Sequence, residues 1–159
     1  MNISIGADHR GFDVATRLAE FLRAGGHTID MHVPPEGQSS DYPETAWLVG
    51  TQVSKGAAEM GLLVCGTGVG MCIAANKVPG IRAASVHDEL TAELSRSHND
   101  ANVICLSADL LGLQLIERIV DLCIRTPFSG GRHARRIEKV ALIEDGKDPR
   151  TWKERAAAG

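Results

Sequence analysis

The most informative run of the sequence is Gly61-Leu-Leu-Val-Cys65-Gly-Thr-Gly-Val-Gly70. Residues 61–65 are apolar without interruption, which is typical of a strand buried on both faces of a parallel sheet. The alternating glycines of residues 66–70 then turn the chain into a short helix that contains Met71 and Ile73. A strand, a glycine turn and a helix in this order predict one βα unit of an α/β domain.

The same alternation continues on both sides of this unit. Short apolar runs predict further strands at residues 2–6, 27–33, 81–86 and 102–106. Apolar residues spaced three and four apart predict helices at residues 12–22, 43–57, 88–97 and 110–124. Five strands that alternate with helices predict a three-layer αβα Rossmann-like (flavodoxin-like) sandwich around a five-stranded parallel sheet.

The pattern changes after residue 125. Phe128-Ser-Gly-Gly131 predicts a flexible link, and a basic helix follows from Arg132 to about Glu144. Residues 126–145 therefore form a helical arm outside the five-unit pattern, and we expect it to pack on a partner subunit. We expect one domain over residues 1–145 and a polar tail over 146–159.

Composition excludes several classes of protein. A chain of 159 residues with a net charge of −3 has the size of one domain and no charge-based attraction to nucleic acid or anionic membranes. It lacks an apolar run of about 20 residues, and its four cysteines include no C-x-x-C pair. The composition indicates a reduced, cytoplasmic enzyme or binding domain without a metal site.

The glycines of residues 66–70 predict an anion site, because they free backbone N–H groups at a helix N-terminus. A tight strand–helix turn is the alternative. A dinucleotide fingerprint needs G-x-G-x-x-G, and Gly66-x-Gly68-x-Gly70 is one residue too short. A phosphotyrosine-phosphatase loop would need arginine where Met71 stands.

Cys65 opens this loop at a strand end, where the N–H dipoles would stabilise a thiolate as base or nucleophile. The other three cysteines, Cys72, Cys105 and Cys123, are expected to be small core residues. Of the six histidines, His9 and His98 lie in polar loops suited to proton transfer, whereas His133 is expected to be an ordinary surface residue.

His98 precedes the fifth expected strand, at the opposite end of the sheet from the glycine loop. It can serve a site there only if its loop bends over or if the site belongs to a neighbouring subunit. Arg132 and Arg136 share one helix face and could bind a phosphate, although a solvated basic face is the alternative.

Together, six segments resemble the type B ribose-5-phosphate isomerase family, which includes allose- and galactose-6-phosphate isomerases. They are Gly6-Ala-Asp-His-Arg-Gly11, Asp41-Tyr-Pro43, Cys65–Gly70 with Ala74-Ala-Asn-Lys77, Gly80-Ile-Arg82, Ser97-His-Asn-Asp100 and Gly130-Gly-Arg-His133. The resemblance implies a metal-free and cofactor-free aldose–ketose isomerisation by a homodimer or dimer of dimers with shared active sites.

The resemblance also implies a role for each matching residue. Cys65 would move a proton between C1 and C2, Thr67 would assist hydroxyl proton transfer, and His98 would open the sugar ring. The N–H groups of Gly66, Gly68, Val69 and Gly70 would stabilise the enediolate. Sugar hydroxyls would be held by Asp8 and Asn99, and the phosphate by His9, Arg132 and Arg136.

One position departs from the family pattern. Asp109 stands where many members carry an arginine, and a carboxylate there would repel a phosphate unless it pairs with Arg132, Arg135 or Arg136. We therefore expect either that phosphate binding depends wholly on the arm, with ribose 5-phosphate as the substrate, or that the substrate is another sugar phosphate (allose 6-phosphate, galactose 6-phosphate or a tetrose phosphate). A non-catalytic module that binds a phosphorylated ligand, and a regulatory or scaffolding oligomer, are the alternatives.

Overall fold

The computed structural model describes residues 1–153; the last six residues of the expected tail, 154–159, lie outside the described part. The strands are β1 (Asn2–Ala7), β2 (Thr28–His32), β3 (Met60–Cys65), β4 (Ala83–Ser85) and β5 (Val103–Ser107). The helices are α1 (Phe12–Ala24), α2 (Tyr42–Ser54), α3 (Val69–Ala75), α4 (Glu89–Ser97), α5 (Leu113–Arg125), α6 (Arg132–Glu144) and the 3₁₀ turn η1 (Pro149–Thr151).

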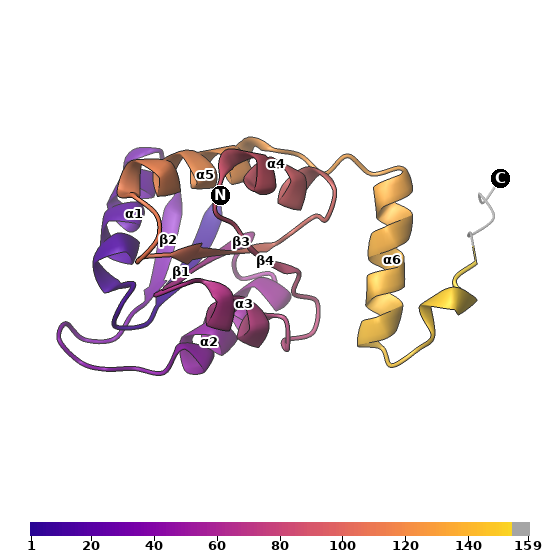
Figure 1. The fold of residues 1–159 in the computed structure, drawn as a ribbon, viewed down its shortest axis with the longest axis horizontal. Coiled ribbons are helices and arrows are strands. Elements are labelled where there is room, and N and C mark those ends of the chain that lie inside the picture. The colour runs from indigo at the N-terminus through magenta and orange to yellow at the C-terminus, as the bar shows by residue number, and fades with distance from the viewer. Residues whose placement is uncertain (154–159) are drawn as a thin grey trace.

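The predicted fold class is confirmed. All four strand pairs are parallel, and α1, α4 and α5 cover one face of the sheet while α2 and α3 cover the other (Figure 1). The strand order is β2-β1-β3-β5-β4, whereas flavodoxin has the order 2-1-3-4-5. Because β5 lies directly beside β3, the loops that follow these two strands are neighbours.

Strand β4 is shorter than the predicted 81–86. The side chain of Asn102 accepts a hydrogen bond from the N–H of Arg82 at 2.8 Å and donates one to the carbonyl of Gly80 at 2.9 Å. The Asn102 side chain thus holds residues 80–82, and the strand begins at Ala83.

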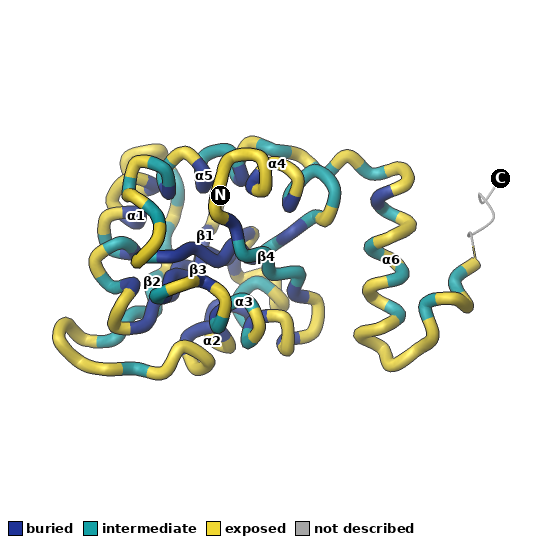
Figure 2. The backbone as a smooth tube through the Cα atoms, viewed as in Figure 1, coloured by how far each residue is buried: buried dark blue, intermediate teal, exposed yellow. Residues whose placement is uncertain are grey.

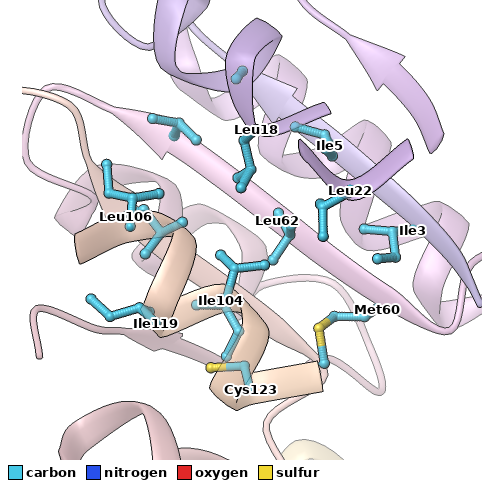
Figure 3. Close-up of a cluster of buried hydrophobic side chains, with 14 of the residues drawn as sticks. Ile3, Ile5, Leu18, Leu22, Met60, Leu62, Ile104, Leu106, Ile119 and Cys123 are labelled. Atoms are coloured by element: carbon cyan, nitrogen blue, oxygen red, sulfur yellow. The ribbon is translucent and has the colours of Figure 1, made fainter. Parts of the chain in front are cut away.

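The core consists of two layers on either side of β3, whose six residues are all buried. Leu62 and Val64 belong to the larger layer with α1 and α5, and Leu63 and Cys65 belong to the layer with α2 and α3. Figure 2 shows the buried sheet, and Figure 3 shows Leu62 among the side chains of the larger layer. Side chains alternate between the faces of a strand, so the continuous apolar run supplies both layers at once.

Gly11 makes the close approach between the β1–α1 turn and β3. A Cβ atom at this glycine would stand 2.4 Å from the Val64 carbonyl oxygen, which is backbone and cannot rotate away. We expect Gly11→Ala to lower the free energy of unfolding by about 1–3 kcal/mol. Gly112→Ala is the matched control, since no atom lies within 4 Å of its Cβ position. Denaturant unfolding of both variants checks this, and equal stability would contradict it.

The arm leaves the layered body after residue 125 and places α6 at one end of the molecule (Figure 1). Gly80 N–H donates to the Glu144 carboxylate at 2.7 Å, which ties the end of α6 to the β4 side of the sheet. The first part of the expected tail folds back on α6, where Trp152 Nε1 donates to Glu138 at 2.7 Å.

Within residues 1–153, no helix is both long and apolar enough to cross a membrane.

Candidate functional site

The glycine loop, residues 66–70, follows the buried end of β3. Gly68 has φ +78°, in the left-handed region that favours glycine, and its Cβ position lies 3.1 Å from the backbone of Leu106. This turn lets Gly68 N–H donate to the Cys65 Sγ at 3.2 Å. Cys65 is 4% exposed, so its thiol is held inside the loop.

Neighbouring elements fix the rest of the loop. Ser107, at the end of β5, donates to the Gly66 carbonyl at 2.6 Å and accepts from Leu110 N–H at 3.0 Å. The ring of Tyr42 lies against Gly70, where a Cβ atom would meet it at 2.9 Å. Thr67 is exposed, and its hydroxyl accepts a 3.4 Å hydrogen bond from the N–H of Val69. The loop is thus rigid on the protein side and open at Thr67.

The turn after β1 brings Asp8 and His9 to the same edge of the sheet. Asp8 is buried, and its Oδ1 accepts from the N–H groups of Arg10 at 2.9 Å and Gly11 at 3.1 Å. His9 is exposed, and its Nδ1 lies 3.3 Å from the Ser40 carbonyl oxygen. Its ring borders a hollow of about 560 Å³ under residues 34–39. The structure therefore brings the predicted residues of the turns after β1 and β3 to the same edge of the sheet.

Asp109 pairs with a residue that the sequence analysis did not consider. Arg10 donates from Nε to Oδ2 at 3.1 Å and from Nη2 to Oδ1 at 2.8 Å. Within the chain, Asp109 does not pair with Arg132, Arg135 or Arg136, because those arginines lie on α6 at the far end of the molecule (Figure 1). The order of the strands makes the difference, since it sets the β5–α5 loop beside Gly66.

A second group of polar residues, the histidine cluster, contains His98, His133, Arg132 and Arg136. The rings of His98 and His133 stack with centroids 4.1 Å apart and planes 11° from parallel. His133 is 7% exposed, so the expectation of an ordinary surface histidine is wrong. Its place in Gly130-Gly-Arg-His133, one of the segments that carry the resemblance, was the available signal. Asn99 is exposed beside His98.

The surroundings of His133 disfavour its charged form. The pKa of His133 lies below its ordinary value, first because the ring is desolvated and then because His98, Arg132 and Arg136 place positive charge nearby. Arg132 Nε also lies 3.4 Å from His133 Nε2, which accepts a hydrogen bond only when it carries no proton. These surroundings favour the neutral form of His133.

This arrangement predicts a pH-dependent stability. The lowered pKa of His133 means that the unfolded chain binds more protons at mildly acid pH, so stability is full above about pH 6.5 and is lost as pH falls through the folded-state pKa. We expect His133→Phe, which retains a ring, to flatten this decline between about pH 5 and 7. Denaturant unfolding at several pH values measures it. The exposed His87→Phe should retain the wild-type slope, and an equal slope in His133→Phe would refute the assignment.

The structure keeps the two groups of predicted residues apart within one chain. His98 caps the end of α4, before β5 begins at Val103, whereas Cys65 pairs with Ser107 at the other end of that strand. A strand of this length spans roughly 17 Å. His98, Arg132 and Arg136 therefore cannot act on a sugar held at Cys65 of the same chain.

The other thiols differ from the expectation at one position. Cys105 and Cys123 are fully buried, as predicted, and burial contributes to the raised pKa of each thiol. Cys72 is only half-buried, and a hydrogen bond with Cys105 is the main cause that lowers its pKa to about 7. Across the described residues, no three His, Cys, Asp or Glu side chains gather into a group that could hold a metal ion.

Comparison with known proteins agrees with this geometry. Residues 3–140 match the ribose/galactose isomerase family model. The chain is 38% identical to D-erythrulose-4-phosphate isomerase of Pectobacterium atrosepticum, over 91% of this chain and 95% of that one. It is 39% identical to ribose-5-phosphate isomerase B of Escherichia coli, over 92% and 98%.

The structure of ribose-5-phosphate isomerase B from Clostridium thermocellum superimposes with a TM-score of 0.90, at 42% identity over 92% of this chain and 99% of that one. The agreement extends through the strand that ends at Cys65, the glycine loop and most of the arm. The fold, the loop and the extent of these matches together place the chain in the ribose/galactose isomerase family of sugar-phosphate isomerases.

Proposed function

We propose that this chain interconverts an aldose phosphate and its ketose, and that ribose 5-phosphate and ribulose 5-phosphate are the pair. The observation that carries the proposal is the buried Cys65 thiol, which accepts a hydrogen bond from Gly68 N–H inside the glycine loop. A buried thiol on an anion loop has the position of a base beside a developing oxyanion, which a pure binding module does not need.

The chemistry requires only proton transfers. The Cys65 thiolate removes the proton from C2 of the open-chain aldose, and the electrons of that bond form the C1–C2 double bond while O1 gains the negative charge. The N–H groups of the glycine loop stabilise this enediolate. A proton moves from O2 to O1 with the help of the Thr67 hydroxyl. Cys65 then returns its proton to C1, which gives the ketose and restores the thiolate.

Ring opening comes from a second copy of the chain. His98 takes the proton of the anomeric hydroxyl, the bond between C1 and the ring oxygen breaks as the C1 carbonyl forms, and the His98 imidazolium gives its proton to the ring oxygen. Since His98 lies a strand length from Cys65 in its own chain, the proposal places the histidine cluster of one protomer over the glycine loop of its partner. Exposed apolar side chains on α2, α3 and α6, including Trp47, Ile73 and Ile143, support a homodimer or a dimer of dimers.

The remaining residues hold the substrate. Asp8 and Asn99 bind sugar hydroxyls, and His9 binds the phosphate together with two arginines of the partner's arm, the counterparts of Arg132 and Arg136. The two guanidinium groups lie one helical turn apart on α6, a spacing that allows both to reach one phosphate.

A tetrose phosphate is the second candidate substrate. The relative from Pectobacterium atrosepticum is named a D-erythrulose-4-phosphate isomerase, and its identity of 38% is close to the 39% of the Escherichia coli ribose-5-phosphate isomerase B. The same proton transfers serve a four-carbon and a five-carbon chain. The two candidate substrates therefore differ in the length of the carbon chain, and not in the reaction.

The deciding experiment measures isomerase turnover in EDTA on ribose 5-phosphate, erythrulose 4-phosphate, allose 6-phosphate and galactose 6-phosphate. The expected result is metal-independent turnover with the highest kcat/KM on ribose 5-phosphate. A higher kcat/KM on another sugar phosphate of this panel would reject ribose 5-phosphate as the preferred substrate but would retain the isomerase reaction. Absence of turnover on every sugar would reject the function in favour of a binding module.

A further inference from the structure

We propose that Arg10, oriented by Asp109, is a phosphate-binding side chain of the glycine-loop site. The inference rests on the proposed function, because it assigns a residue to the same substrate. It concerns a cation from the β1–α1 turn, which lies in the same chain as Cys65, in addition to the arginines of the partner's arm.

The pair lies directly on the glycine loop. A Cβ atom at Gly66 would stand 2.9 Å from Asp109 Oδ2 and 3.4 Å from Arg10 Nε, so both side chains touch the residue that follows Cys65. Asp109 is fixed to the loop by its backbone as well, since its N–H donates to the Gly66 carbonyl at 3.1 Å. The Arg10 guanidinium is thus held at the first turn of the anion loop.

The guanidinium retains free donors in this position. Asp109 accepts one bond from Nε and one from Nη2, which engages two of the five N–H groups of an arginine. The side chain of Arg10 is 58% exposed, so the fork formed by Nη1 and Nη2 is open to solvent. A phosphate can bind that fork while the carboxylate holds the opposite edge.

Electrostatics requires such a cation at the loop. Asp109 Oδ2 lies 2.9 Å from the Cβ position of Gly66, so an anionic substrate at the glycine loop would meet a like charge there. Arg10 neutralises the carboxylate through its paired bonds and leaves its outward fork positive. Asp109 in turn removes rotational freedom from Arg10 before the ligand binds, so it acts as a positioning residue.

The test compares Arg10→Ala with wild type in steady-state kinetics and in inhibition by inorganic phosphate. We expect KM for the sugar phosphate and Ki for phosphate to rise together, by about 10- to 100-fold, with little change in kcat. Arg10→Lys keeps the charge but loses the forked guanidinium, so its KM and Ki should lie between those of the wild type and Arg10→Ala. It also provides the test if Arg10→Ala fails to fold.

Two further variants separate ligand binding from structure. Arg118→Ala is the matched control, because Arg118 is 59% exposed and forms a similar 2.9 Å ion pair with Glu89 on the surface of α5; it should leave KM and Ki unchanged. Adding Asp109→Asn to Arg10→Ala should recover part of the lost affinity, since it removes an unpaired negative charge from the site. If the Arg10–Asp109 ion pair only stabilised the fold, the double variant would not recover affinity for phosphate.

An unchanged Ki for phosphate in both Arg10 variants would overturn the inference even if the wild type is a fast isomerase. If the wild type turns over none of the sugar phosphates, the proposed function fails, and calorimetry with inorganic phosphate then tests Arg10 by itself. Binding to the wild type that weakens at least about tenfold in Arg10→Ala supports the assignment. Equal binding refutes it.

Discussion

Replacement of Cys65 by alanine is expected to lower isomerase kcat by about 10²–10⁴-fold or more, because the variant lacks the base that moves the proton between C1 and C2. KM for the sugar phosphate and the Ki of inorganic phosphate should stay near the wild-type values, since the loop N–H groups and the arginines remain. Steady-state kinetics with phosphate as inhibitor measures both effects.

Cys72→Ala is the matched control for this experiment. Cys72 is the thiol whose pKa falls to about 7, and it packs against the same core layer as Cys65, but it lies outside the glycine loop. We expect Cys72→Ala to retain turnover. If Cys65→Ala kept its activity and Cys72→Ala lost it, the base would be misassigned. Unfolding curves of the two variants would show whether either change acts through stability.

Mixing two inactive variants is expected to restore activity if active sites are shared. In a heterodimer of Cys65→Ala and His98→Ala chains, one site carries both substitutions and the other carries neither. Random exchange of subunits should therefore return about one quarter of the wild-type activity. This large gain from two nearly inactive proteins follows from the separation of His98 and Cys65 by the length of β5.

The experiment needs subunit exchange, which brief dilution in mild denaturant followed by return to buffer provides. Mixing Cys65→Ala with Thr67→Ala is the control, because both residues belong to the glycine loop and no heterodimer site is intact. If the Cys65→Ala and His98→Ala mixture stayed inactive after proven exchange, each site would be built within one chain. A fully active monomer at high dilution would exclude the shared site as well.

The apolar run at 61–65 predicted the central strand, because an uninterrupted run that ends at a glycine turn is typical of a strand buried on both faces. The glycines at 66–70 were sufficient to predict the loop, since Gly68 adopts a φ of +78° that other residues rarely adopt. Local sequence dictates these features because the backbone geometry and side-chain burial involved span only a few residues.

The histidine stack could not be predicted in this way. His98 and His133 are separated by a strand and a helix, and their contact at 4.1 Å depends on where α6 lies. The sequence indicated that His98 lies at the wrong end of its own sheet, which is confirmed, but it gave no sign that His133 is buried against it. Two local patterns do not specify the distance between them.

The sequence by itself thus determined the αβα class, the glycine loop and the family, all of which follow from short segments and their order. Only the tertiary structure decided that β5 lies beside β3, which set Asp109 against Gly66 and joined it to Arg10 rather than to the basic helix. Strand order is a property of the whole chain, fixed by the packing of all the crossover helices together. Contacts between loops that follow neighbouring strands therefore emerge only when the sheet is assembled.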